Sequence, residues 1–162
     1  RCASMGVLGN ALWQGGERPE DAIPVLEVTL ALHRRFWPND EQNILGVQTN
    51  LAGCLDDLGQ HHEAVVLKRE TFDRQVATLG VSNECTILSG NNVATSLLGL
   101  ERWEEAKTLL GEKLLPAARK SLGADHNLTL RLGQNLADAL YSDPERTRDD
   151  LLEAETIMKH VV

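Results

Sequence analysis

Aromatic residues are scarce in this chain. Only 4% of its 162 residues are Phe, Trp or Tyr, while 42% are hydrophobic. A single globular core of this size usually contains more rings, whereas a stack of thin layers of Leu, Ala and Val buries itself with fewer. The hydrophobic content, together with 25% charged residues, lies outside the composition range of disordered proteins. The composition therefore favours a folded, layered protein.

Long apolar runs and an excess of basic residues are also missing. No segment approaches the roughly 18 apolar residues that span a bilayer, and the N-terminal segment Arg1–Gly6 has no apolar signal-peptide core. The formal net charge of −8 would repel a phosphate backbone at long range. We therefore predict neither a membrane nor a nucleic acid as a partner.

Cysteine residues are few and show no pairing pattern. The three are Cys2, Cys54 and Cys85, an odd number at irregular spacing. Secreted proteins that depend on disulfides usually have an even number at recognisable spacings. We expect free thiols and a reducing compartment, and we predict a cytoplasmic location.

Sequence signatures of catalysis and metal binding are absent. The chain has no Gly-x-Ser-x-Gly, His-Glu-x-x-His or Cys-x-x-Cys motif and no phosphate-binding glycine loop. His61, His62 and Glu63 are adjacent, but neighbours on a helix point about 100° apart, and no further His or Cys follows one turn later. We interpret this tripeptide as a solvated turn. We predict no enzymatic activity, no metal and no cofactor.

A repeat with a period near 42 residues organises the chain. A marker Ala recurs at Ala22, Ala64 and Ala106, and a marker Asn recurs at Asn50, Asn92 and Asn135. In the second unit, Leu51, Leu55 and Leu58 form a stripe of helical period that Gly59 ends, since glycine readily adopts a positive φ. A second helix follows, with Phe72 on its apolar side. The pattern predicts pairs of helices that shield one another's apolar sides.

Four units follow from this period, at about residues 1–39, 40–82, 83–125 and 126–162, which make three full repeats and an irregular fourth. The fourth inserts a longer polar turn at Tyr141–Arg148. The second helix of the third contains Gly111, Pro116 and one extra residue, which predicts a bulge or kink around residues 111–116. Ser82 or Asn83 is placed to cap the next helix. Both ends look cut, so we expect one repeat array within a longer protein.

The phrase Asn-Leu-Ala, followed by Leu, Gly and Glu-Ala, resembles the tetratricopeptide repeat (TPR). The 42-residue spacing and the connector Leu122–Thr129 resemble the long variant found in kinesin light chains and nephrocystin-3-like proteins. The likeness covers nearly the whole chain. It implies an all-α fold, a right-handed superhelix of antiparallel helical hairpins whose first helices line a concave groove. It also implies that His126, in the connector, caps or braces a helix, and that Trp103 wedges a hairpin core.

The resemblance implies which residues face the groove. In such repeats the marker Asn commonly hydrogen-bonds the backbone of an extended peptide, because an amide both donates and accepts. The matching positions and their polar neighbours are Asn10, Gln14, Asn50, Asp57, Asn92, Thr95, Arg131, Asn135 and Asp138. An alternative role for the marker Asn is to bond neighbouring helices and fix the repeat geometry.

The expected groove is acidic, with Asp57 and Asp138 against Arg131, whereas cargo-binding kinesin light chains use basic grooves for acidic peptides. A kinesin-type cargo role is therefore not expected. We predict a protein–protein interaction scaffold that binds an extended peptide or partner protein in the groove. Two alternatives remain open: a spacer or assembly subunit that docks through second-helix residues such as Lys68 and Arg69, and a regulatory repeat region of a longer multidomain enzyme. The sequence does not predict the partner or the oligomeric state.

Overall fold

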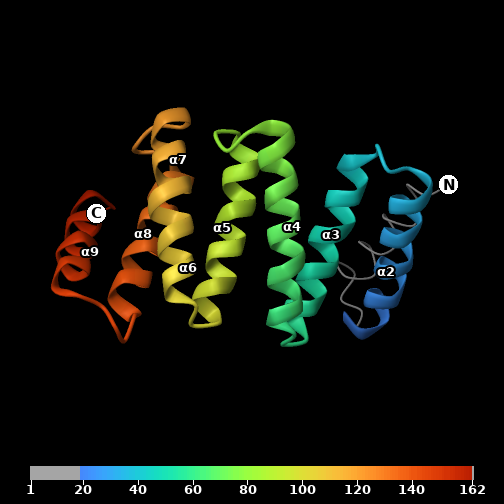
Figure 1. The fold of residues 1–162 in the computed structure, drawn as a ribbon, viewed down its shortest axis with the longest axis horizontal. Coiled ribbons are helices and arrows are strands. Elements are labelled where there is room, and N and C mark those ends of the chain that lie inside the picture. Colours follow the sequence, from blue (N-terminus) through green and yellow to red (C-terminus); the bar gives the residue numbers. More distant parts are fainter. Residues whose placement is uncertain (1–18, 162) are drawn as a thin grey trace. The chain divides into compact units, whose positions relative to one another are not determined.

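The computed structural model describes residues 19–161, with side chains up to Lys159, and within this range it is helical without strands (Figure 1). The predicted all-α class is confirmed. The elements are α2 (Pro19–Phe36), α3 (Glu41–Asp57), α4 (His61–Leu79), α5 (Glu84–Gly99), α6 (Trp103–Lys107), the π-helix η1 (Thr108–Leu114), α7 (Leu115–Ser121), α8 (Asn127–Ser142) and α9 (Arg148–Val161).

The chain divides into two compact parts, residues 1–71 and residues 72–162, and the division falls within α4. The helices α3, α5 and α8 begin at Glu41, Glu84 and Asn127, close to where the second, third and fourth repeat units are expected to start. The exact boundaries of the four units stay a prediction.

In the N-terminal part, α2 and α3 pack along each other and share one core with the start of α4. Its buried residues are Ala22, Leu26, Leu30, Ile44, Val47, Leu51, Cys54, Leu55 and Ala64. Ala22 and Ala64, two of the marker residues, are completely buried, because only small side chains fit where helices cross closely. Gly59 has φ of 75°, so it ends the first helix of the second unit in the left-handed conformation, as predicted.

In the C-terminal part, α5 begins with the predicted cap. The side chain of Asn83 accepts a hydrogen bond of 2.9 Å from the backbone N–H of Cys85. A few residues later, Gly90 allows a close approach: a Cβ there would lie 2.9 Å from Phe72 Cε2 and 2.6 Å from Leu114 Cδ2. The side chains from α4 and η1 therefore rest directly on the backbone of α5.

The helix from Trp103 to Ser121 is continuous but contains a π-helical segment at Thr108–Leu114. The N–H of Leu115 donates to the carbonyl of Leu110, a spacing of five residues that absorbs the extra residue of this unit. Pro116 follows, and its ring would crowd the carbonyl one α-turn earlier. The predicted bulge is confirmed.

The connector before α8 has the expected brace. Gly123 has φ of 100°, and His126 Nδ1 accepts a hydrogen bond of 3.3 Å from the N–H of Leu128. The predicted long turn of the fourth unit is also present, between Ser142 and Arg148.

Two expectations need correction. Trp103 is half-buried rather than in the core, because it opens α6 beside the exposed Glu104 and Glu105. His61 and His62 are exposed as expected, but they form the first turn of α4 rather than the turn before it. No helix within residues 19–161 combines the length and the apolar character that crossing a membrane requires.

Candidate functional site

One face of α5 is polar and exposed. Asn92 and Thr95 are both exposed, whereas Asn91, Val93 and Ala94 on the opposite side are buried. The hydroxyl of Thr95 donates to the carbonyl of Asn91 at 3.0 Å, so only its acceptor capacity remains toward solvent. The amide of Asn92 has no hydrogen-bond partner within residues 19–161 and is therefore available in both directions.

One face of α8 has the same character. Arg131 and Asp138 are exposed, about two turns apart, while Leu132 and Leu136 between them are buried. Neither charged side chain has an ion pair in the described part of the chain. The two charges are of opposite sign, so this face carries no net charge of its own.

An amide pair connects the two helices. Asn135 Nδ2 donates to Asn91 Oδ1 at 2.9 Å, from α8 to α5. Asn91 is 3% exposed, so the bond is sheltered from water at one end. Asn135 thus fills the alternative role of bonding a neighbouring helix, while its own carbonyl oxygen has no partner among the described residues.

Asn91 was not among the predicted site residues. The repeat spacing aligns Asn92 with Asn50 and Asn135, and both Asn91 and Asn92 are amides. Only the burial of α5 distinguishes the two, since Asn91 faces the core and Asn92 faces solvent. The sequence does show two adjacent asparagines at this point. The repeat period, however, predicts no hydrogen-bond partner for Asn91.

The remaining predicted residues lie in the N-terminal part or outside the described range. Asn50 is half-buried on α3 and Asp57 is exposed at its end. Asn10 and Gln14 lie outside the described residues. The other five lie in the C-terminal part, Asn92 and Thr95 on α5 and Arg131, Asn135 and Asp138 on α8. The hydrogen bond from Asn135 to Asn91 joins these two helices.

The two cysteines among the described residues are free thiols. Burial raises the pKa of the Cys54 thiol, and the nearby charge of Asp57 raises it further. A thiol held protonated in this way is a poor nucleophile. Within residues 19–161 no group of His, Cys, Asp or Glu side chains is arranged to hold a metal ion.

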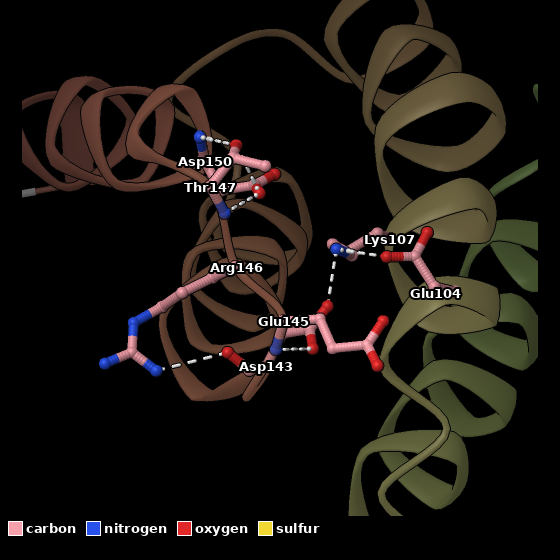
Figure 2. A network of polar contacts seen from close by, with 7 residues as sticks. All are labelled: Glu104, Lys107, Asp143, Glu145, Arg146, Thr147 and Asp150. Carbon is pink, nitrogen blue, oxygen red and sulfur yellow. Dashed lines mark hydrogen bonds and ion pairs between the residues drawn. The ribbon is translucent and has the colours of Figure 1, made fainter.

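A polar network fixes the long turn between α8 and α9 (Figure 2). Lys107 Nζ lies 2.7 Å from Asp143 Oδ2 and 2.5 Å from Glu104 Oε1. Asp143 also accepts a hydrogen bond of 2.8 Å from the N–H of Glu145. Thr147 and Asp150 bond each other reciprocally across the first turn of α9, as a helix cap. The turn is therefore held at both ends.

The charges of this network stabilise one another. The hydrogen bond from Lys107, followed by that from the Glu145 N–H, holds the pKa of the Asp143 carboxyl below its usual value. Burial alone would lower the pKa of the Lys107 ammonium, but the hydrogen bonds to Asp143 and Glu104 outweigh it and raise that pKa. Both groups stay charged across the neutral range, which suits a structural ion pair rather than proton transfer.

No protein-family model matches the sequence, and no curated protein matches it. Solved structures do match. A kinesin light chain-like protein of Podosopora anserina with nearly identical TPR-like repeats is 24% identical, with a TM-score of 0.77, and a variant of that protein gives a TM-score of 0.79. In both comparisons 98% of this chain and 72% of the other chain are covered.

A third similar structure is BtubC (BKLC) of P. vanneervenii, with 16% identity and a TM-score of 0.75, covering 97% of this chain and 59% of that one. At such identities the likeness shows the fold alone. The chain has the TPR-like helical-repeat fold seen in kinesin light chain-like proteins, and the predicted array of helical hairpins of this type is confirmed.

Proposed function

We propose that this chain is a protein-interaction scaffold, and that the exposed polar faces of its leading helices bind an extended peptide segment of a partner protein. The TPR-like fold of its structural neighbours indicates a protein-interaction repeat. The proposal that the chain binds a peptide rests on the amide of Asn92, which is exposed and has no hydrogen-bond partner within residues 19–161. Asn92 lies on α5, and the neighbouring helix α8 contains Asn135.

The chemistry of this face suits a peptide backbone. An amide at a fixed position accepts from a backbone N–H and donates to a backbone carbonyl, whatever side chain follows. The carbonyl oxygen of Asn135 adds a second acceptor, and its bond to Asn91 holds it in one orientation, which reduces the entropy lost on binding. Arg131 and Asp138 lie about one helical turn on either side of Asn135 on α8 and offer one charge of each sign.

We assign no catalytic role to the chain and place it in the cytoplasm. The free thiols of Cys54 and Cys85 support a reducing compartment. The TPR-like fold supports a role in binding rather than in chemistry.

The test begins with a peptide selected from a random displayed library on the intact chain. Its Kd is then measured by calorimetry for the wild type, Asn92→Ala and Asn135→Ala. Loss of a hydrogen bond in the bound state is expected to weaken binding by roughly tenfold, about 1.4 kcal/mol, for Asn92→Ala. The melting temperature of Asn92→Ala is expected to stay unchanged, because this amide has no partner within residues 19–161.

The matched control is Asn39→Ala, the same change at an exposed turn position outside α5 and α8. It should bind as the wild type does. Peptides that bind Asn92→Ala and Asn135→Ala normally, but lose affinity for Arg69→Glu, would contradict the proposal and favour docking through the second helices.

A further inference from the structure

A pocket of about 300 Å³ lies among α7, α8 and α9, within the C-terminal part. Its apolar walls come from Leu115, Leu130 and Ile157, and Thr129 and Gly133 form its α8 side. The volume is at the lower end of the range of small-ligand sites, roughly 300 to 1,000 Å³. It exceeds the space of about 150 Å³ in which an aliphatic cavity binds a benzene ring.

The preceding repeat shows what occupies the equivalent place. Gly90 on α5 corresponds to Gly133 on α8, and each follows a Thr by one helical turn, Thr86 and Thr129. On α5 the ring of Phe72 lies against the Gly90 backbone. Leu115 stands at the same distance in sequence before Gly133 as Phe72 does before Gly90. An aliphatic side chain thus replaces a ring where the pocket opens.

The two threonines also differ, because the hydroxyl of Thr86 has a hydrogen-bond partner and that of Thr129 has none among the described residues. The hydroxyl of Thr86 donates to the carbonyl of Gln75 at 3.5 Å, across to the preceding helix. Thr129 is 2% exposed and lines the pocket, yet its hydroxyl has no partner in the described part of the chain. Leaving a buried hydroxyl without a hydrogen-bond partner costs free energy. The pocket therefore lacks both the aromatic ring of the preceding repeat and a partner for the Thr129 hydroxyl.

We propose that this pocket binds one aromatic side chain of a partner polypeptide, with tyrosine preferred to phenylalanine. The ring takes the place that Phe72 occupies in the preceding repeat, against Leu115, Leu130 and Ile157. The phenolic hydroxyl hydrogen-bonds the Thr129 hydroxyl, since tyrosine combines a large apolar body with a polar tip.

The rim supports a peptide as the source of the ring. Arg119 and Asp125 line the pocket, are exposed, and have no ion pair among residues 19–161. A guanidinium donates to the backbone carbonyl beside the bound residue, and a carboxylate accepts from its N–H. The pocket is separate from the proposed peptide-binding face, because Thr129 and Gly133 are buried on one side of α8 while Arg131 and Asp138 are exposed on the other.

The test uses N-acetyl-L-tyrosinamide, N-acetyl-L-phenylalaninamide and N-acetyl-L-leucinamide as probes of the intact chain. Methyl NMR spectra follow Leu115, Leu130 and Ile157. We expect saturable shifts of these methyls with the tyrosine probe, at a Kd on the order of millimolar for so small a ligand. The phenylalanine probe should bind several-fold more weakly and the leucine probe should not saturate.

Leu115→Phe fills the pocket with the residue found at the equivalent position of the preceding repeat, and should abolish the saturable shifts. Leu88→Phe makes the same change at an exposed site on α5 and should leave them intact. If Leu115→Phe does not fold, Ala124→Leu narrows the exposed mouth of the pocket and should abolish them instead.

Binding of the tyrosine probe that Leu115→Phe or Ala124→Leu leaves unchanged would overturn the proposal. So would equal affinities for the leucine and tyrosine probes, or an absence of shifts at the three wall residues. Asn92→Ala should bind the tyrosine probe normally, so this test succeeds or fails independently of the proposed peptide-binding face.

Discussion

Gln48 lies inside the N-terminal part with both ends of its amide unpartnered. Its exposure is 0%, and neither Oε1 nor Nε2 has a hydrogen-bond partner within residues 19–161. A buried amide without partners costs roughly 1 to 3 kcal/mol, and an apolar group of the same shape removes that cost. We expect Gln48→Met to raise the free energy of unfolding by about 1 to 2 kcal/mol in urea titrations.

Gln42→Met is the matched control, since Gln42 is exposed on the same helix. It should change stability by no more than about 0.5 kcal/mol. A lower stability for Gln48→Met than for Gln42→Met would show that the buried amide has partners in solution.

Two glycines of the C-terminal part provide a second contrast. A Cβ at Gly111 would meet Leu136 at an ordinary 3.6 Å, whereas a Cβ at Gly90 would lie within 3 Å of the buried Leu114 and Phe72. We expect Gly111→Ala to stabilise the chain by about 0.5 to 1 kcal/mol through helix propensity. Gly90→Ala should destabilise it by about 1 to 3 kcal/mol through overpacking. Thermal unfolding of the two variants measures both changes in stability. Changes of the same sign in Gly111→Ala and Gly90→Ala would contradict the packing described.

Single residues were predictable where a local rule acts. Gly59, Asn83 and His126 end or cap helices as expected, because each role depends on neighbours a few positions away. The burial and the hydrogen bonding of Asn91 and Gln48 were not predictable. Both depend on which side of a helix packs against helices that are distant in sequence.

The long turn between α8 and α9 depends on an ion pair from another helix. Lys107 and Asp143 are 36 positions apart in sequence, and the Asp143 side chain is buried. No periodic pattern links the two, so the sequence predicted the length of the turn but not its anchor. The π-segment of η1 was predictable instead, because an extra residue and a proline within one helix leave few other solutions.

The pH dependence of this anchor has a definite sign. The pKa of Asp143 is lowered in the folded chain, so its contribution to stability is complete above its ordinary value of 3.8 and is lost as the pH falls through the lowered value. We expect Asp143→Asn to melt several degrees below the wild type at neutral pH, and the difference to shrink below pH 3.8.

Circular dichroism melts of the wild type and Asp143→Asn, from neutral pH to below pH 3.8, measure the effect. Asp138→Asn, the same change at an exposed position of the preceding helix α8, is the control and should show little difference at any pH. A gap between Asp143→Asn and the wild type that stays constant into acid would contradict the role given to the carboxylate.

At the scale of the whole molecule, the repeat period made the fold predictable. The pattern recurs at Ala22, Ala64 and Ala106 and predicts the same helix packing in each unit. The prediction of the fold therefore does not depend on any single segment. The candidate site was predictable only in part. Its leading helices follow from the period, but the hydrogen bond between Asn135 and Asn91 depends on how α5 and α8 pack, which the period does not report.

The net charge of −8 acts on any partner before contact. We expect peptides selected on the intact chain to be neutral or basic, because an acidic peptide is repelled at long range. The association rate of the basic peptides should fall as salt is raised from roughly 0.05 to 0.5 M, with a smaller effect on dissociation. Stopped-flow measurements test this, and a library enriched in acidic peptides would contradict it.

The most direct measurement is an NMR titration of the chain with a selected peptide, observing side-chain amide and backbone resonances. We expect the largest shifts at Asn92, Thr95 and Asn135, on the exposed faces of α5 and α8. Shifts confined to second helices such as α4 and α7, with the Asn92 amide unmoved, would contradict this expectation.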